Sequence, residues 1–167
     1  MMLGAVLDIR CPFFAEHGLD CPVPPDRRTE QAVFRPRGFK LHPLVEVSVR
    51  LDRMTLLGAE LVFANAMLRH PARRFQAYNL GAAFLEFMVP RQQLSRVEHL
   101  VTEAAHAVEL ARSSEGSVSW LQPGRDFSLN LEGVSIRSSA HPERTDRYRV
   151  AVGSDAGGSR PWWKSLF

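Results

Sequence analysis

Apolar positions between residues 91 and 116 recur at three- and four-residue spacing, which places them on one side of a helix. Pro90 suits the position just before the first turn, where its missing N–H costs nothing. Gly116 suits the left-handed conformation in which many helices end. The pattern therefore predicts one amphipathic helix over residues 91–116, with its apolar stripe formed by Leu94, Val97, Val101, Ala104, Val108 and Ala111.

Alternation of apolar and polar residues predicts the strands. The clearest case is residues 44–51, where Val45, Val47 and Val49 alternate with polar residues. After Gly116 the period is again two. It predicts three or four short strands within residues 117–122, 127–139 and 147–153, with a turn or bulge at residues 132–133.

Three further segments are apolar without a clear period. Residues 3–9 and 82–89 favour strands because both runs are short, although a short apolar run such as 82–89 also fits a helix. Residues 53–69 are apolar on nearly every side and predict a largely buried helix, capped by Asp52 and ended by His70 and Pro71. Residues 72–81 between them predict a basic turn.

Residues 10–43 contain more than half of the chain's 11 prolines, which disfavours regular structure there. We expect a long arm with short edge pieces such as residues 32–34. Its apolar residues, Phe13, Phe14, Val33, Phe34 and Phe39, imply that the arm packs onto the body. The sequence thus predicts an α+β fold: one domain over residues 1–152, with a small, mainly antiparallel sheet packed against two helices.

Composition narrows the class of protein. The chain is 45% hydrophobic and 23% charged with a net charge of +3, which is ordinary for a globular domain. Only Lys40 and Lys164 of the 21 basic residues are lysine, a bias typical of a GC-rich bacterial genome. We expect no membrane-spanning segment, no secretory signal and a cytoplasmic location, in which Cys11 and Cys21 are free thiols.

Metal-ligand residue types occur in two places. Cys11, His17, Cys21 and His42 lack the close ligand pairs of a zinc finger. His99, Glu103 and His106 share one face of the predicted long helix, and the Glu-x-x-His spacing is used in di-iron bundles. The solvated side of a helix is the simpler interpretation. No nucleophile elbow or phosphate loop is present in the sequence, so we assign no catalytic residue, metal or cofactor.

An arginine-rich stretch with aromatic neighbours suggests binding of nucleic acid or of an acidic partner. It comprises Arg69, Arg73, Arg74, Phe75 and Tyr78. A guanidinium group forms bidentate hydrogen bonds with a phosphate or a carboxylate, and an adjacent aromatic ring can stack on a nucleic-acid base. Residues 98–115 are acidic, so charge is segregated along the chain, which favours oriented docking.

The last 15 residues, 153–167, predict a flexible linker and an aromatic tail. Trp162, Trp163 and Phe167 are costly to leave in water, so the tail is expected to dock either on its own domain or on another subunit. Together these features favour a non-enzymatic binding or assembly subunit of a bacterial multi-protein complex, with another protein or a second copy as partner. A nucleic-acid-binding subunit and a small metal-dependent enzyme are the alternatives.

Overall fold

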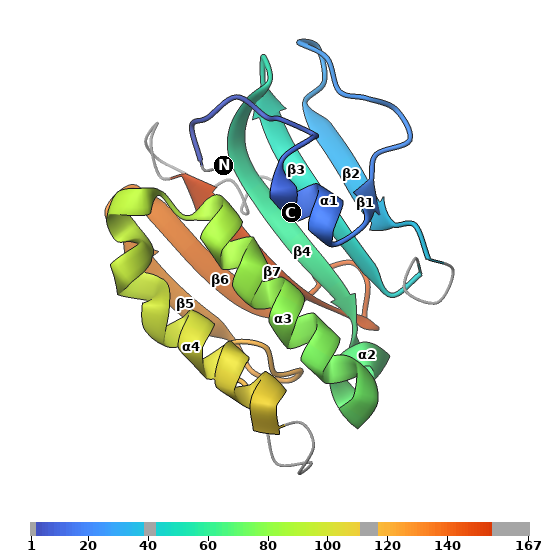
Figure 1. Cartoon of the computed structure of the whole chain (residues 1–167), viewed down its shortest axis with the longest axis vertical. Coiled ribbons are helices and arrows are strands. Elements are labelled where there is room, and N and C mark those ends of the chain that lie inside the picture. The colour runs from blue at the N-terminus through green and yellow to red at the C-terminus, as the bar shows by residue number, and fades with distance from the viewer. Residues whose placement is uncertain (1–2, 39–42, 111–116, 155–167) are drawn as a thin grey trace.

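The computed structural model describes residues 3–38, 43–110 and 117–154. A seven-stranded antiparallel sheet carries all its long helices on one face (Figure 1). The α+β class is therefore confirmed. Among the described helices, none has the length and apolar character needed to cross a bilayer.

The strand order across the sheet is β1-β2-β3-β4-β7-β6-β5, and every neighbouring pair is antiparallel. The strands are β1 (Leu19–Asp20), β2 (Gln31–Pro36), β3 (Val45–Asp52), β4 (Thr55–Ala64), β5 (Phe127–Leu131), β6 (Val134–Ala140) and β7 (Arg147–Ser154). The helices are α1 (Pro12–Glu16), α2 (Asn65–Arg69), α3 (Pro71–Met88) and α4 (Leu94–Leu110), with a 3-10 turn η1 (Arg91–Gln93) before α4.

The predicted strand pattern of residues 44–51 is confirmed in β3. Val47 pairs with Leu61 of β4, and Leu61 pairs with Val150 of β7, so these buried side chains point to the same, helix-covered face. The predicted strands within 127–139 and 147–153 are also confirmed as β5, β6 and β7. Gly133 turns β5 into β6 with φ of 72°, a conformation that favours glycine.

The helix predicted over residues 53–69 is wrong for most of its length. Residues 55–64 form strand β4, and only Asn65–Arg69 is helical. β4 lies in the middle of the sheet and most of its side chains are buried, so its sequence is apolar without alternation. Asp52 does not cap a helix, because Arg53 and Met54, with φ of 46° and 70°, turn the chain from β3 into β4.

The strand predicted over residues 82–89 and the turn over 72–81 are also wrong, since both belong to helix α3. α3 lies along the sheet between α1 and α4 (Figure 1) and is buried on more than one side, so it lacks the clear apolar stripe of a surface helix. Residues at its own N-terminus stabilise the start of the helix. Pro71 occupies the first turn, and the Nδ1 atom of His70 accepts the N–H of Ala72 at 3.2 Å.

The long amphipathic helix is confirmed as α4, from Leu94 to Leu110, although residues 111–116 lie outside the described part of the chain. Val97, Leu100, Ala104 and Ala107 face the core, and Leu94, Val101 and Val108 pack against its border. α4 packs beside α3 rather than across it (Figure 1).

Two predicted strands are replaced by irregular structure. Residues 3–9 form no strand, and Val6 makes an isolated bridge to Thr55. Residues 117–122 form turns in which Trp120 and Leu121 are buried against α3. Gly81 of α3 permits this close approach, because a Cβ atom there would lie 2.7 Å from Cδ1 of Leu121. The Nε1 atom of Trp120 donates to the carbonyl oxygen of Leu100 at 3.1 Å.

The Pro-rich arm contains more structure than predicted, namely α1, β1 and β2, but it packs onto the body as expected. The rings of Phe14 and Phe34 stack with centroids 4.1 Å apart, and Phe13 stacks on Phe87 of α3 at 4.5 Å. These rings belong to the same core as the helices and the sheet.

Candidate interaction surfaces

The predicted arginine patch is brought together where α2 meets the first turns of α3. Arg69 and Arg73 are exposed, and Arg74 and Phe75 are half-buried. Tyr78 is 4% exposed, and burial raises the pKa of its phenol. Its ring therefore cannot stack on a base, which corrects the prediction for this residue.

The three candidate metal ligands on α4 do lie along one shallow depression of about 590 Å³, together with Ser95, Glu98 and Thr102. The carboxylate of Glu103, however, already accepts hydrogen bonds from another part of the chain. Its two carboxylate oxygens accept the N–H and the hydroxyl of Ser119 at 2.6 and 2.8 Å. This carboxylate therefore anchors the segment that carries Trp120. Sequence spacing gave no sign of the contact, because Ser119 lies beyond the end of the helix.

The cysteines are free thiols in the structure, as predicted. Cys11 is buried, and the Sγ of Cys21 donates to the carbonyl oxygen of Val23 at 3.1 Å. Half-burial lowers the pKa of His17, whose ring lies 5.5 Å from that of Phe13. His42 lies outside the described residues. Within residues 3–38, 43–110 and 117–154, no three His, Cys, Asp or Glu side chains are grouped so that they could hold a metal ion.

Two hollows flank the C-terminal part of α3, one towards α4 and one towards α1, and share Glu86; together we call them the α3 groove. Its larger part, of about 660 Å³, is lined by Glu86, Val89, Arg91, Leu94, Ser95, Glu98 and Val101. Its smaller part, of about 240 Å³, is lined by Cys11, Pro12, Phe13, Glu16, His17, Ala83, Glu86 and Phe87. Glu86 is exposed and belongs to both parts.

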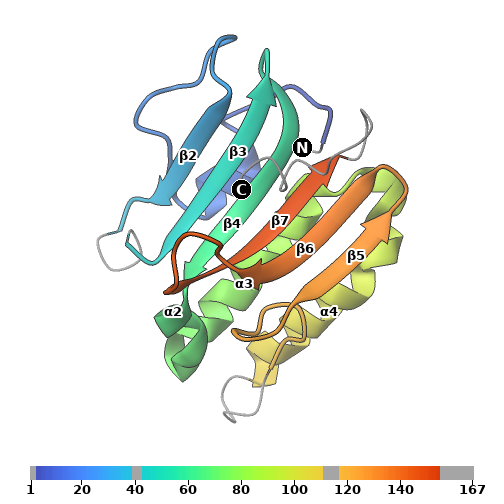
Figure 2. The ribbon, with the colours of Figure 1, turned by 180° about the vertical axis from the view of Figure 1, so that it is seen from behind.

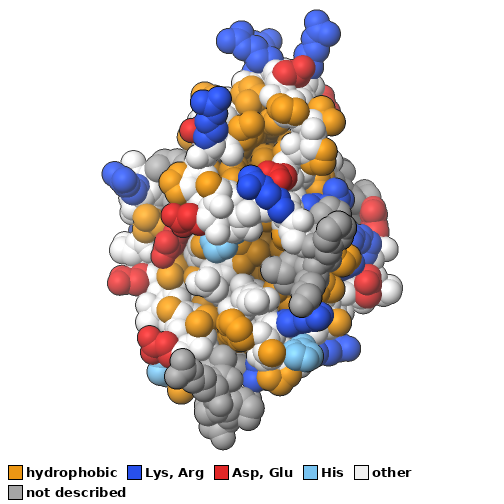
Figure 3. All heavy atoms as spheres, turned by 45° about the vertical axis from the view of Figure 1, so that its right-hand side comes forward, with side chains coloured by type: hydrophobic (Ala, Val, Ile, Leu, Met, Phe, Trp, Pro, Cys, Tyr) orange, Lys and Arg blue, Asp and Glu red, His pale blue; other side chains and the backbone are white. Residues whose placement is uncertain are grey.

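The α3 groove combines an apolar base with a mainly acidic rim. Leu94 and Val101, both half-buried, supply apolar surface, Glu86 and Glu98 supply two negative charges, and Arg91 adds one positive charge. Figure 3 shows apolar side chains between charged groups on the side of the molecule that carries α1 and β2. The sequence prediction missed the groove because it placed Glu86 in a strand. In a helix, Asn79, Ala83 and Glu86 share the outward side.

The sheet face turned away from α3 and α4 is a second surface, which we call the open face. No described helix lies over it (Figure 2). By the strand register it consists of Gln31, Val33, Arg35, Glu46, Ser48, Arg50, Gly58, Glu60, Val62, Ser128, Asn130, Ser135, Arg137, Ser139, Arg147, Arg149, Ala151 and Gly153.

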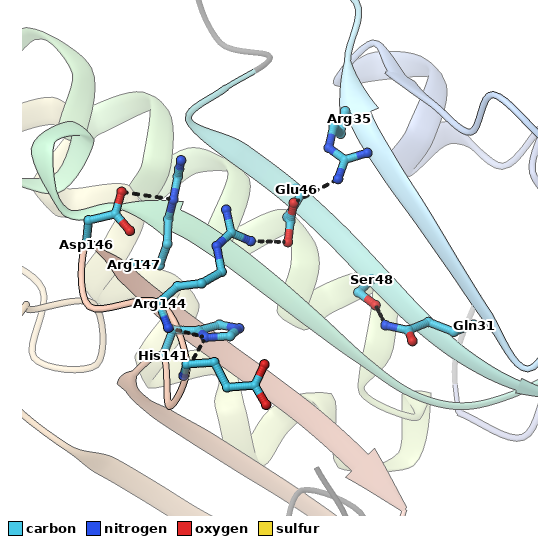
Figure 4. A network of polar contacts seen from close by, with 9 residues as sticks. Gln31, Arg35, Glu46, Ser48, His141, Arg144, Asp146 and Arg147 are labelled. Atoms are coloured by element: carbon cyan, nitrogen blue, oxygen red, sulfur yellow. Dashed lines mark hydrogen bonds and ion pairs between the residues drawn. The ribbon is translucent and has the colours of Figure 1, made fainter. Parts of the chain in front are cut away.

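Glu46 is the centre of a polar network on the open face (Figure 4). It accepts from Arg35 at 3.3 Å and from Arg144 at 2.7 Å. Arg144 belongs to the β6–β7 loop, residues 141–146, which therefore reaches over β7 and β4 to β3. The Nδ1 atom of His141 accepts the N–H groups of Glu143 and Arg144, each at 3.2 Å, which fixes the loop conformation.

The predicted partner-binding residues Trp162, Trp163 and Phe167 lie outside the described residues. No protein-family model matches this chain, and neither a curated protein nor a solved structure matches it significantly.

Proposed function

We propose that this chain is a non-enzymatic binding subunit of a bacterial, cytoplasmic multi-protein complex, and that it docks a partner protein in the α3 groove. The observation that carries the proposal is the groove itself, a hollow of about 660 Å³ with apolar surface from Leu94 and Val101 of α4 and a rim that carries Glu86, Glu98 and Arg91. Grooves of this kind hold an amphipathic helix or an extended segment through a few apolar anchors.

The partner is defined by the chemistry of the groove. Leu94 and Val101 lie about two turns apart on the same side of α4 and offer two apolar contacts. Glu86 and Glu98 favour a segment with lysine or arginine beside its apolar anchors, because complementary charge steers encounter and sets orientation. The proposed partner segment is therefore basic and amphipathic.

Two observations weigh against the alternatives. A metal-dependent enzyme using His99, Glu103 and His106 loses its carboxylate ligand, because both oxygens of Glu103 already accept from Ser119. A nucleic-acid site at Arg69 and Arg73 keeps its cations and the half-buried ring of Phe75, but loses the buried ring of Tyr78 as one of its two stacking partners. Stacking on aromatic rings supplies much of the affinity for single strands.

The experiment uses site-specific photo-crosslinking in cells and peptide binding in solution. A photo-reactive residue replaces Ser95, in the groove, or Asn130, exposed on the opposite side of the sheet. We expect position 95, and not position 130, to capture a protein. In solution, a labelled amphipathic peptide with leucine anchors and lysines should bind, and its lysine-to-glutamate version should not.

Charge-reversal variants provide the matched comparison. Glu98→Lys should weaken peptide binding by about tenfold or more, since a like charge then faces the peptide. Glu109→Lys, exposed on the same helix but outside the groove, should leave binding unchanged. If position 95 captures nothing, and the protein instead shifts RNA or DNA at low salt in a manner lost in Arg73→Ala, the proposal fails and nucleic-acid binding replaces it.

A further inference from the structure

Several side chains on the open face are buried although the helices cover the other face of the sheet. Val62 is 1% exposed, Arg149, Ala151 and Ser135 are each 3% exposed, and Glu60 is 8% exposed. A sheet face that meets water leaves such residues partly accessible, and arginine is almost never fully buried unless it is paired and covered. These residues therefore have something lying over them.

The β6–β7 loop covers only one end of this surface. Arg144 bonds to Glu46, and His141 lies close to the charges of Glu60 and Arg149. Ser135 and Gly153 pair with each other further along the sheet, four residues beyond Arg149 on β7. At a strand rise of about 3.3 Å per residue, this is about 13 Å from Arg149.

The remaining part of the surface is shaped to receive flat rings. Gly58 of β4 pairs with Gly153 of β7, and Gly153 pairs with Ser135 of β6, so one row across three strands has no large side chain. The next row contains Ala151 between Glu60 and Arg137. We call these small residues, Gly58, Ser135, Ala151 and Gly153, the shallow row.

We propose that residues 160–167 of this same chain, RPWWKSLF, cover the shallow row of the open face, with the indole rings of Trp162 and Trp163 lying over Gly58, Ala151 and Gly153. The tail thus docks in cis and completes the domain as a third layer. This inference is independent of the proposed function, because the α3 groove lies on the other side of the sheet.

The length of chain permits this arrangement. β7 ends at Ser154, beside Gly153 of the shallow row. Seven residues lie between Ser154 and Trp162, and the eight Cα–Cα steps that join the two span up to about 27 Å when extended. A strand as long as β7 has nearly the same length, so the tail can fold back over it. Gly157 and Gly158 permit the reversal, since glycine adopts turn conformations at no steric cost.

The chemistry of the two surfaces also agrees. Two tryptophans bury a large apolar area, and the flanking guanidinium groups of Arg50 and Arg137 are suited to stack on indole faces. A short flexible linker holds the tail at an effective concentration in the millimolar range. Docking on the same chain is therefore favoured over docking on a second copy at lower protein concentration.

Acrylamide quenching of tryptophan fluorescence in the full chain tests the inference. Trp120 is buried, and the Trp162→Ala/Trp163→Ala double variant gives its emission alone. We expect the wild-type chain to be quenched no more strongly than this baseline. Gly153→Val fills the shallow row and should raise quenching several-fold. Ser128→Val places the same valine side chain at an exposed position of the same face, on edge strand β5, and should change nothing.

Each alternative has its own outcome. If two of the three tryptophans of the wild-type chain are freely quenched, the tail is solvated and the inference is overturned, whatever the variants do. Protection that disappears on dilution, with a matching dimer-to-monomer change in sedimentation, indicates docking on a second copy and also overturns it. If Trp162 and Trp163 stay protected from acrylamide in a folded Gly153→Val variant, the tail docks elsewhere and the inference is overturned.

Discussion

Arg149 of β7 donates from a guanidinium N–H to the Oε1 atom of Glu60 on β4 at 2.7 Å, and both side chains are buried on the open face, 4% and 11% exposed. Removing one member leaves an uncompensated buried charge. We therefore expect Glu60→Ala to lower the free energy of unfolding by about 3–5 kcal/mol in urea denaturation. Replacing both members, as Glu60→Leu with Arg149→Met, should recover most of that loss. Equal losses in the single and double variants would contradict the paired-charge account.

The exposed pair of Arg37 and Asp20 is the control, and Asp20→Ala should leave the denaturation midpoint unchanged.

Glu103 is predicted to stabilise the fold rather than bind a metal. Glu103→Ala removes the acceptors of both the N–H and the hydroxyl of Ser119, so we expect a loss of about 1–3 kcal/mol in unfolding free energy. Ser119→Ala removes only the hydroxyl bond and should cost less. Glu109→Ala, an exposed position on the same helix, is the comparison. A Glu103→Ala protein that is as stable as wild type but has lost bound metal would reverse the assignment.

Stability should decrease as pH falls below neutrality because of His141. Burial is the largest cause that lowers the pKa of His141 from its ordinary value of 6.5; the positive charges of Arg149 and Arg144 act in the same direction, and the negative charges of Glu60 and Glu143 oppose it. Below pH 6.5 the unfolded chain therefore binds protons that the folded chain does not, and the folded state loses stability until the lowered pKa is passed. His17, whose pKa is lowered by burial, acts in the same direction.

The variant His141→Asn isolates this effect. Asparagine also accepts N–H groups two and three residues ahead, as His141 does, but it does not titrate. Between about pH 7.5 and about pH 5, its urea midpoint should fall less than that of the wild-type protein. Parallel slopes for the variant and the wild-type protein would exclude His141 as the source.

Neither of the chain's two tyrosines should ionise near pH 10 in the folded protein. Burial raises the pKa of Tyr148 to about 12, and its hydroxyl donates to the carbonyl oxygen of Arg125 at 2.8 Å. Burial also raises the pKa of Tyr78. Ultraviolet titration should therefore show no phenolate step until the chain unfolds. In concentrated urea both residues should ionise near pH 10. Because the unfolded state loses these protons first, stability should decrease as pH rises above 10.

Sequence pattern predicted the elements whose two sides meet different environments. β3 alternates because one face packs under the helices and the other carries Glu46 and Ser48, and α4 has a stripe because one side meets water. β4 and α3 lie in the middle of the fold and are covered on more than one side, so their periods are hidden. β4 was therefore predicted as a helix, and α3 as a turn followed by a strand. The positive φ angles of Arg53 and Met54, which make the β3–β4 turn, are not encoded by glycine or asparagine.

The candidate surfaces were less predictable than the fold. The arginines at positions 69, 73 and 74 lie at the end of α2 and in the first turn of α3, which follow one another in the chain. The burial of Tyr78, the Glu103–Ser119 contact and the α3 groove each depend on packing between elements that are distant in sequence. No local sequence pattern specifies contacts between distant segments, so these features are visible only in the three-dimensional structure.

The pairing of β4 with β7 joins residues 55–64 to residues 147–154, so the middle of the sheet closes only when the end of the described chain is present. During synthesis, the apolar β4 emerges from the ribosome well before its second neighbour. Pairing β4 with β7 closes a loop that spans residues 65–146, and closing so long a loop is slow compared with local helix formation. The nascent chain therefore exposes an unpaired hydrophobic strand edge for much of its translation, a state that favours aggregation and recruits chaperones.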